Sequence, residues 1–241
     1  MAATAGARRL TEEHRTLQVQ VAARTVTAMR DLWPLMEPTD VDSSFGPWSR
    51  SALPVIAEQH TASARLGGNY LSSFKALELG LDAEPVAPLL ATLNTDQVLT
   101  SLYVTGPIEV KKQMAAGRTL GEAMDRASAS SASSALRLAL NGGRDTISDT
   151  LSTDPQARGW ARVTSRRCCS FCAMLAARGP VYGAASVRFR AHDGCACTVE
   201  PVYRPDAEWP PSSRRWAGLW DEAVAADGDT VTEFRRLVEA A

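Results

Sequence analysis

The chain has 241 residues, of which 45% are hydrophobic and 22% charged, as is usual for a globular protein. Its formal net charge of −1 excludes a global attraction to nucleic acid or membrane surfaces. No run of about 18 apolar residues is present, so we expect no membrane span. The N-terminus lacks the apolar segment of a signal peptide, and we therefore expect reduced cysteines in a cytosol.

Apolar residues at spacings of three and four predict an all-α first half. The predicted helices cover residues 11–32, 50–79, 96–105, 108–116 and 119–140. Pro34 ends the first of them, and residues 38–48, rich in Pro, Asp, Ser and Gly, predict a linker. Thr119 and Glu122 form a capping box that opens the last helix of this half.

Glycines mark three positions in these helices. Gly67 and Gly68 weaken the second helix, which tolerates them if another helix crosses closely there. Gly80 is a plausible end of that helix, and the run Asn141-Gly142-Gly143 is predicted to end the helix that begins at Thr119. A domain boundary is therefore expected between residues 141 and 155.

The first half also contains two of the three histidines. His14 has no second ligand three or four residues away, which favours a surface or interface residue over a metal ligand. His60 lies in the mostly apolar stripe of its helix and is predicted to be a core residue.

The second half mixes short strands and helices, so the predicted fold class is α+β. Strand-like runs cover residues 160–164, 181–182, 187–189 and 197–202, and residues 169–177 have helical propensity. The spacing of Trp216, Leu219, Trp220 and Val224 predicts a docking helix, and a last helix spans residues 230–238. The predicted units are a helical region at 1–150, a metal-binding module at 151–205 and a helical tail at 206–241.

All five cysteines lie in this module. Cys169 and Cys172 form a C-x-x-C, and His192, Cys195 and Cys197 form an H-x-x-C-x-C about twenty residues later. Two tight ligand pairs separated by a loop are typical of a tetrahedral zinc site. Gly194 permits the positive φ that the second turn needs.

The choice of the fourth ligand stays open at this stage. Cys195 completes a four-ligand set, but Cys197 shares its face on an extended strand. Cys168 is interpreted as a bystander. Four protein ligands leave no position for water, which favours a structural zinc over a catalytic one, and no zinc-deaminase or H-E-x-x-H pattern is present.

Three interpretations compete with a metal. The cysteines can be a disulfide pair or buried thiols, although their odd number argues against a secreted disulfide framework. A third is a Cys169 thiolate nucleophile with His192 as its base, which leaves the other clustered cysteines unexplained. No G-x-S-x-G elbow or phosphate loop is present.

The module is also locally basic. Arginines are frequent in the module and just before it, namely Arg144, Arg158, Arg162, Arg166, Arg167, Arg178, Arg188 and Arg190. They indicate either a patch that faces DNA or an acidic partner, or a solvated surface. In the second case the acids of the tail would compensate them, namely Asp206, Glu208, Asp221 and Glu222.

The motifs together resemble a known family. W-A-R-V-T-S is followed by C-x-x-C-x-M-L-x-x-R-G-P-V-Y and then by H-x-x-C-x-C-T-V-x-P-V-Y. This combination, from Gly159 to Tyr203, resembles the C-terminal domain of the MuF-like minor head proteins of tailed bacteriophages, which also have a helical N-terminal region. Many relatives have a charged residue between the last two cysteines, where this chain has Ala196.

The resemblance implies a minor capsid protein that acts in head morphogenesis. Its expected partners are the portal, the scaffold or the major capsid protein, with possible DNA contact through the arginines and no membrane. It is expected in the virion head or procapsid, and in the host cytoplasm during assembly. Related reading frames in actinobacterial phages are often labelled capsid maturation protease, which is one alternative; a zinc-dependent nucleic-acid-binding module is the other.

Overall fold

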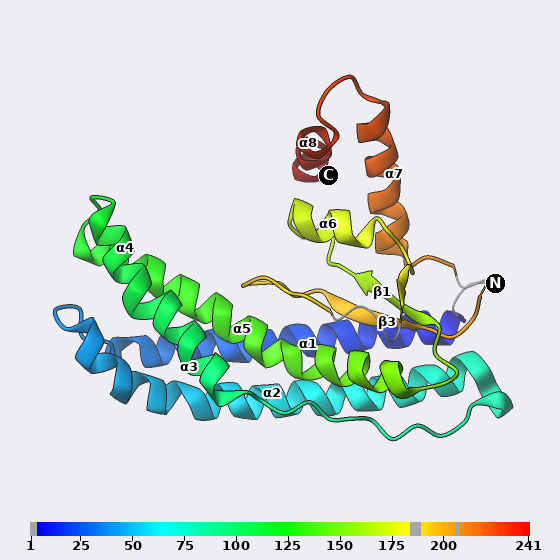
Figure 1. Ribbon diagram of the computed structural model, residues 1–241, viewed down its shortest axis with the longest axis horizontal. Coiled ribbons are helices and arrows are strands. Elements are labelled where there is room, and N and C mark those ends of the chain that lie inside the picture. Colours follow the sequence, from blue (N-terminus) through cyan, green and yellow to red (C-terminus); the bar gives the residue numbers. More distant parts are fainter. Residues whose placement is uncertain (1–3, 184–188, 206–207) are drawn as a thin grey trace.

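The fold is α+β, as predicted, with a layer of long helices, a small sheet on that layer and further helices beyond the sheet (Figure 1). A computed structural model describes residues 4–183, 189–205 and 208–241. The predicted strand at 187–189 therefore lies partly outside the described residues. No helix of the described part is long and apolar enough to cross a membrane.

The helical layer contains α1 (Ala5–Leu32), α2 (Val41–Leu79), α3 (Thr95–Tyr103), α4 (Glu109–Ala115) and α5 (Leu120–Thr153). The second half contains β1 (Gly159–Val163), α6 (Ser170–Ala176), β2 (Tyr182–Gly183), β3 (Thr198–Val202), α7 (Pro211–Ala225) and α8 (Thr230–Ala240). The strands form an antiparallel sheet in the order β2-β1-β3, with Trp160 opposite Tyr182 on one side and Pro201 on the other. A π-helical turn at residues 104–108 joins α3 to α4 where Gly106 and Pro107 predict a break.

Side-chain caps fix where the long helices begin. Thr4 accepts a hydrogen bond from the Ala7 amide at α1, and Asp40 accepts one from the Ser43 amide at α2. The predicted capping box of Thr119 and Glu122 is confirmed at α5. Gly80 ends α2 with a φ of 61°, as predicted.

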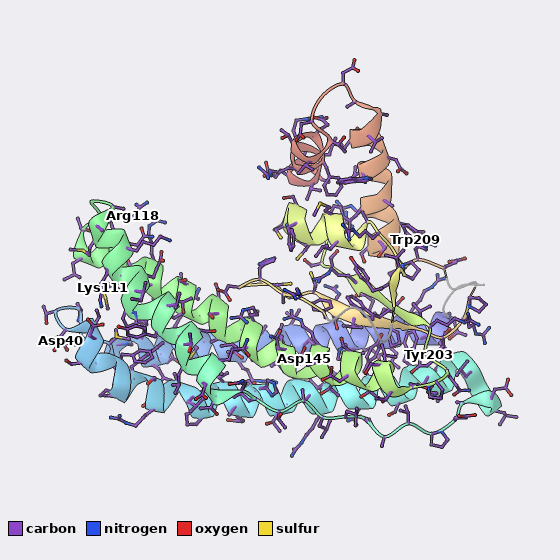
Figure 2. The ribbon with its side chains drawn as sticks, in the orientation of Figure 1. Asp40, Lys111, Arg118, Asp145, Tyr203 and Trp209 are labelled. Carbon is purple, nitrogen blue, oxygen red and sulfur yellow. The ribbon has the colours of Figure 1, made fainter. Side chains whose placement is uncertain are left out.

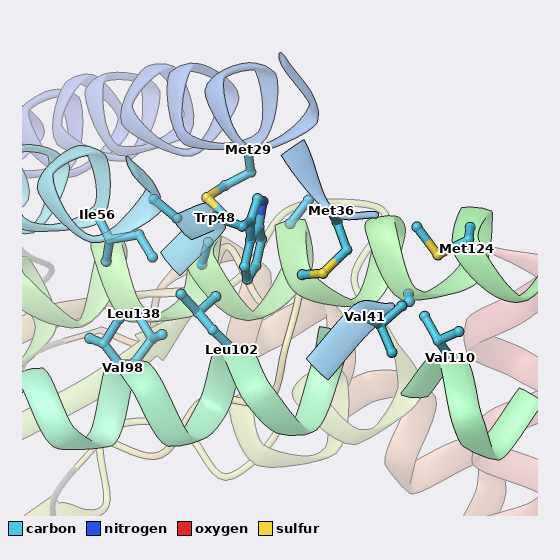
Figure 3. Close-up of a cluster of buried hydrophobic side chains, with 14 of the residues drawn as sticks. Met29, Met36, Val41, Trp48, Ile56, Val98, Leu102, Val110, Met124 and Leu138 are labelled. Atoms are coloured by element: carbon cyan, nitrogen blue, oxygen red, sulfur yellow. The ribbon is translucent and has the colours of Figure 1, made fainter. Parts of the chain in front are cut away.

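The linker predicted at residues 38–48 is wrong, because α2 already begins at Val41 and contains Pro47. An internal proline costs a helix roughly 3 kcal/mol. Trp48, which follows it, is fully buried and packs with Met29 and Met36 in the cluster of Figure 3. Burial of a tryptophan contributes on the order of 4–6 kcal/mol, which offsets the proline.

The helix end predicted at residues 141–143 is also wrong, because α5 continues to Thr153. A Cβ at Gly142 would lie 2.1 Å from the His60 carbonyl oxygen, and one at Gly67 would lie 2.7 Å from that of Gly143. The backbones of α2 and α5 are therefore in direct contact, as expected for the glycines of α2. This contact outweighs the roughly 1 kcal/mol that each glycine costs a helix.

Half of the buried residues of α1 are polar, which the apolar pattern did not indicate. The buried residues are Ala7, Thr11, His14, Gln18, Val21, Ala22, Thr25 and Met29. Leu17 lies on the same helix but is 42% exposed. Of the two places predicted for His14, the surface is wrong: the residue is buried between α1 and α2, where its ring stacks on Tyr70 with 4.3 Å between centroids. His60 is buried, as predicted.

One hydrophobic cluster joins the helical layer to the sheet. It contains Tyr70, Phe74 and Ile147 from the helices together with Trp160 and Val199 from the strands. Beside it, Lys75 and Asp154 form a buried ion pair of 2.9 Å, and the Tyr203 hydroxyl donates to Asp154. Tyr203 lies between the sheet and the helices in Figure 2.

The helices α6, α7 and α8 form a second, smaller core beyond the sheet (Figure 1). Ala173, Trp216 and Phe234 lie in its centre. Trp209, labelled in Figure 2 at the base of α7, packs so close to Gly179 that a Cβ there would lie 2.5 Å from the indole. Gly179 follows the end of α6 and has a φ of 68°, a left-handed conformation that glycine adopts readily.

Glu200 is a buried carboxyl group on β3, at the contact between the sheet and α1. Its desolvation raises its pKa from about 4.5 to about 7; Glu78 adds to the rise, whereas Thr11 and Arg8 act against it. Between these pH values the folded chain binds more protons than the unfolded chain. The contribution of Glu200 to stability therefore falls as the pH rises from about 4.5 through 7.

Replacement of Glu200 by Gln should remove this dependence. At pH 8 we expect Glu200→Gln to be more stable than the wild type by on the order of 3 kcal/mol, with little difference near pH 4.5. The variant should still lose stability below pH 6.5, because burial lowers the pKa of His14 to about 4. Urea unfolding between pH 4.5 and 8.5 measures both slopes, with the exposed Glu58→Gln on α2 as control. Parallel curves for wild type and Glu200→Gln would contradict this assignment.

Candidate metal centre

Two of the sequence-predicted ligands lie at the start of α6. Cys169 is the N-cap residue, with φ −69° and ψ 157°, and its sulfur accepts a hydrogen bond from the Cys172 amide at 3.4 Å. This geometry places both thiols on the same side of the first helical turn. Cys169 is exposed and Cys172 is buried.

The other predicted ligands lie in a turn that precedes β3. The Cys195 amide donates to the His192 carbonyl at 3.1 Å, and Gly194 has a φ of 75°, which confirms its predicted role. Cys195 and Cys197 are both buried. His192 is exposed, and the Phe171 ring lies edge-on to it at 6.3 Å.

The structure brings all five predicted ligands together. The His192 Nε2 atom lies 3.2 Å from the Cys169 sulfur and 3.2 Å from the Cys172 sulfur. The Cys172 and Cys195 sulfurs are 3.6 Å apart. The ligand atoms fall into two groups of three, Cys169, Cys172 and His192 in one and Cys172, Cys195 and Cys197 in the other, within 4.8 Å of one another in each group. Cys172 belongs to both groups.

These residues form a cluster that can hold a metal ion. A tetrahedral zinc ion would place its ligand sulfurs about 3.8 Å apart and a sulfur and an imidazole nitrogen about 3.5 Å apart. The observed separations of 3.6 and 3.2 Å are close to these values. Thiolate and imidazole together suit a soft or borderline divalent ion.

The tautomer of His192 also fits a ligand. Its Nδ1 atom lies 2.7 Å from the Asp193 carbonyl oxygen. Because a carbonyl oxygen only accepts, Nδ1 carries the proton and donates it. The lone pair then resides on Nε2, the atom that points at the sulfurs, as metal-binding histidines require.

The pKa values of the buried thiols are shifted in opposite directions. Hydrogen bonds from Cys172 and Cys197, assisted by the charge of Arg144, lower the pKa of Cys195 well below its usual range. The hydrogen bond that Cys172 shares with Cys195 raises the pKa of Cys172 instead. Cys195 is therefore the thiolate of this group, which is the form that binds a metal.

A set of contacts from α5 holds the second ligand pair, and sequence reasoning missed them. The buried Arg144 side chain donates to the carbonyl oxygens of Cys195 and Cys197, the latter at 3.0 Å. Arg137 forms a 2.6 Å ion pair with Asp193. The Gly194 amide donates to the Ser133 carbonyl at 3.0 Å. The sequence signal for these contacts was Arg144, which directly follows Gly142 and Gly143. This arginine was interpreted only as surface charge.

The other candidates lie apart from the cluster. Cys168 is half-buried and belongs to neither group of metal ligands found in the described residues, in keeping with its predicted role as a bystander. His14 and His60 are likewise outside those groups. Both histidines are buried in the helical layer, so neither is placed to act on a substrate.

The fold and the site together define a largely helical protein with a small antiparallel sheet and a cluster of thiols and one imidazole that can hold a metal ion. Residues 6–223 match the family model described as VG15 protein. The chain therefore belongs to the VG15 protein family. No curated protein and no solved structure matches it.

Proposed function

We propose that this VG15-family chain is a minor head protein of a tailed phage that assists head assembly near the portal or capsid. Its family is named for a viral protein. The observation that carries the proposal is the place of the MuF-like motifs. The motifs between Gly159 and Tyr203 supply β1, α6 and β3 and also all five residues of the cluster.

In this proposal the metal is a structural zinc. Cys169, Cys172, His192 and Cys195 hold it, and Cys197 is the competing fourth ligand. Zinc would supply the folding free energy that a small α+β unit lacks, because its ligands converge only in the folded chain. Four protein ligands leave no open position for water, so the site has no catalytic role.

The helical layer is the part that we expect to contact the portal, scaffold or major capsid protein. Its end away from the sheet is formed by α4 and the start of α2, where Lys111 and Arg118 lie in Figure 2. Lys111 forms an ion pair with Asp42 at 2.7 Å there, and Val104 and Met114 expose apolar surface. This combination of charge and apolar surface suits contact with another protein.

One observation favours a second function, a thiol protease. Cys169 and His192 are exposed and their sulfur and nitrogen are 3.2 Å apart, which is the reach of a nucleophile and its base. The same nitrogen, however, is equally close to Cys172. A nitrogen shared between two sulfurs favours a metal ligand over a base that serves one nucleophile.

Assembly in cells tests both functions. The chain would be expressed with the portal, scaffold and major capsid genes of its phage, and purified particles analysed by intact-mass spectrometry. We expect the wild type in the particles and Cys169→Ala to be incorporated several-fold less, because loss of a metal ligand weakens the unit. The mass of the major capsid protein should be the same in both preparations. Cys168→Ala is the matched control and should behave as the wild type.

Two outcomes would contradict the proposal. If particles form with normal yield and composition when this chain is left out of the expression, it has no function in head assembly. A Cys169→Ala chain that keeps its zinc and its place in the particle, but leaves uncleaved capsid precursor, would identify a protease instead.

A further inference from the structure

The surface of the second half is more basic than the net charge of the chain indicates. Between residues 151 and 205 the acids are Asp154, Asp193 and Glu200. Asp154 and Glu200 are buried, and Asp193 is paired with Arg137. By contrast, the exposed arginines of this stretch are Arg158, Arg166, Arg167, Arg178 and Arg190. None of these five forms an ion pair within the described residues.

Two other arginines of the basic stretch are not part of this surface. Arg144 and Arg162 are buried and lie over the Phe189 ring, 5.3 and 3.8 Å from its centre. Their side chains are therefore part of the protein interior. Arg188 lies outside the described residues. The structure thus separates structural arginines from free ones, which the sequence presents as a single run.

The acids of the tail do not compensate the free arginines. Glu208 forms its ion pairs with Arg8 and Arg214, at 2.7 and 3.0 Å. Asp221 and Glu222 are exposed on α7, and neither pairs with an arginine of residues 151–205 in the described part of the chain. Asp206 lies outside the described residues.

Two of the free arginines line a groove. Arg166 and Arg167 occupy the turn between β1 and α6, and they face Arg15 of α1 and the end of α8 across a hollow. Glu239 and Ala241 also line the groove, where the Ala241 oxygen accepts a hydrogen bond from Arg215, and Arg15 has its own partner in Glu12 at 3.0 Å. The turn is anchored on both sides, by the Thr164 amide, which donates to Ser212, and by the N-cap residue Cys169.

We propose that this groove binds the phosphate backbone of nucleic acid. Arginine guanidinium groups match phosphate oxygens in geometry and charge, and a groove with arginines on two walls can follow a strand. The contacts would be made to the backbone and would carry no sequence preference. This site lies beside the metal cluster, whose Cys169 anchors the turn, and it does not depend on the proposed head function.

Fluorescence anisotropy with a labelled duplex of mixed sequence tests the groove in the full, metal-loaded chain. Affinity should fall steeply as salt rises. Arg166→Ala/Arg167→Ala should bind about tenfold or more weakly at 100 mM salt and reduce the slope of log K against log salt by about two. Arg50→Ala/Arg65→Ala removes the same charge from exposed positions on α2 and should keep the wild-type slope.

Both groove arginines are exposed, so unchanged metal content and melting temperature should accompany the loss. If the double variant does not fold, each single variant should reduce the slope by about one. The proposal fails if the wild type does not bind the duplex at 50 mM salt, or if both double variants weaken binding equally. Binding to poly-glutamate without binding to DNA would also overturn it and indicate an acidic protein partner.

Discussion

Gly142→Ala should destabilise the protein by on the order of 3 kcal/mol or more, although alanine is the better helix former by about 1 kcal/mol. The new methyl carbon would lie 2.1 Å from the His60 carbonyl oxygen and 3.2 Å from the Ala64 amide nitrogen. Both are backbone atoms, so the contact is relieved only if α2 and α5 move apart. That movement would open the core between them.

Equilibrium unfolding in urea measures this effect. Gly121→Ala is the matched control, because it lies in the same helix with no atom within 4 Å of its Cβ position. It should leave stability unchanged or raise it by up to about 1 kcal/mol. A Gly142→Ala protein as stable as the control would show that the two helices do not meet as described.

Cys172→Ser should remove most of the metal from the protein. We expect the wild type, purified under reducing conditions, to carry about one zinc ion per chain. Cys172 belongs to both groups of ligand atoms and is buried, so serine there weakens every arrangement of ligands that the cluster offers. Structural zinc sites contribute roughly 10–16 kcal/mol of apparent binding free energy, and loss of a ligand thiolate forfeits a large part of it.

Metal analysis after gel filtration, with a competing chelator, measures the loss. Cys168→Ser is the control and should keep a full equivalent, because this thiol lies outside both groups. Cys195→Ser should lose more zinc than Cys197→Ser, since the Cys195 sulfur is 3.6 Å from that of Cys172. The reverse order would make Cys197 the fourth ligand. A Cys172→Ser protein that retains a full equivalent would refute the site.

The sequence was sufficient for the local part of the site. Cys169 and Cys172 are three residues apart, and His192 and Cys195 form a tight turn, so the spacing alone predicts that each pair converges. The support from α5 was not predictable in this way. Arg144 reaches Cys197 across 53 positions of the chain, and no local pattern distinguishes a buried arginine that holds carbonyl oxygens from an exposed one.

The same distinction explains the errors in the fold. The start of α5 was predicted from its capping box at Thr119 and Glu122, whereas the single side-chain caps at Thr4 and Asp40 were missed. Pro47 and Gly142 were interpreted as breaks because each weakens an isolated helix. In the folded chain Trp48 and the close approach of α2 to α5 outweigh those local costs, and both effects depend on distant segments.

The polar face of α1 has a consequence for synthesis on the ribosome. Thr11 contacts Tyr70 early in the chain, but the neighbouring Glu200 on β3 follows almost 190 residues later. At 5–20 residues per second, α1 waits roughly 10–40 s for that strand. During this time Thr11 and Gln18, which lie beside Glu200 and Thr198 in the folded chain, present water with groups that it can solvate, where leucines would attract other nascent chains. The polarity of this face thus protects the first helix until the last strand of the sheet arrives.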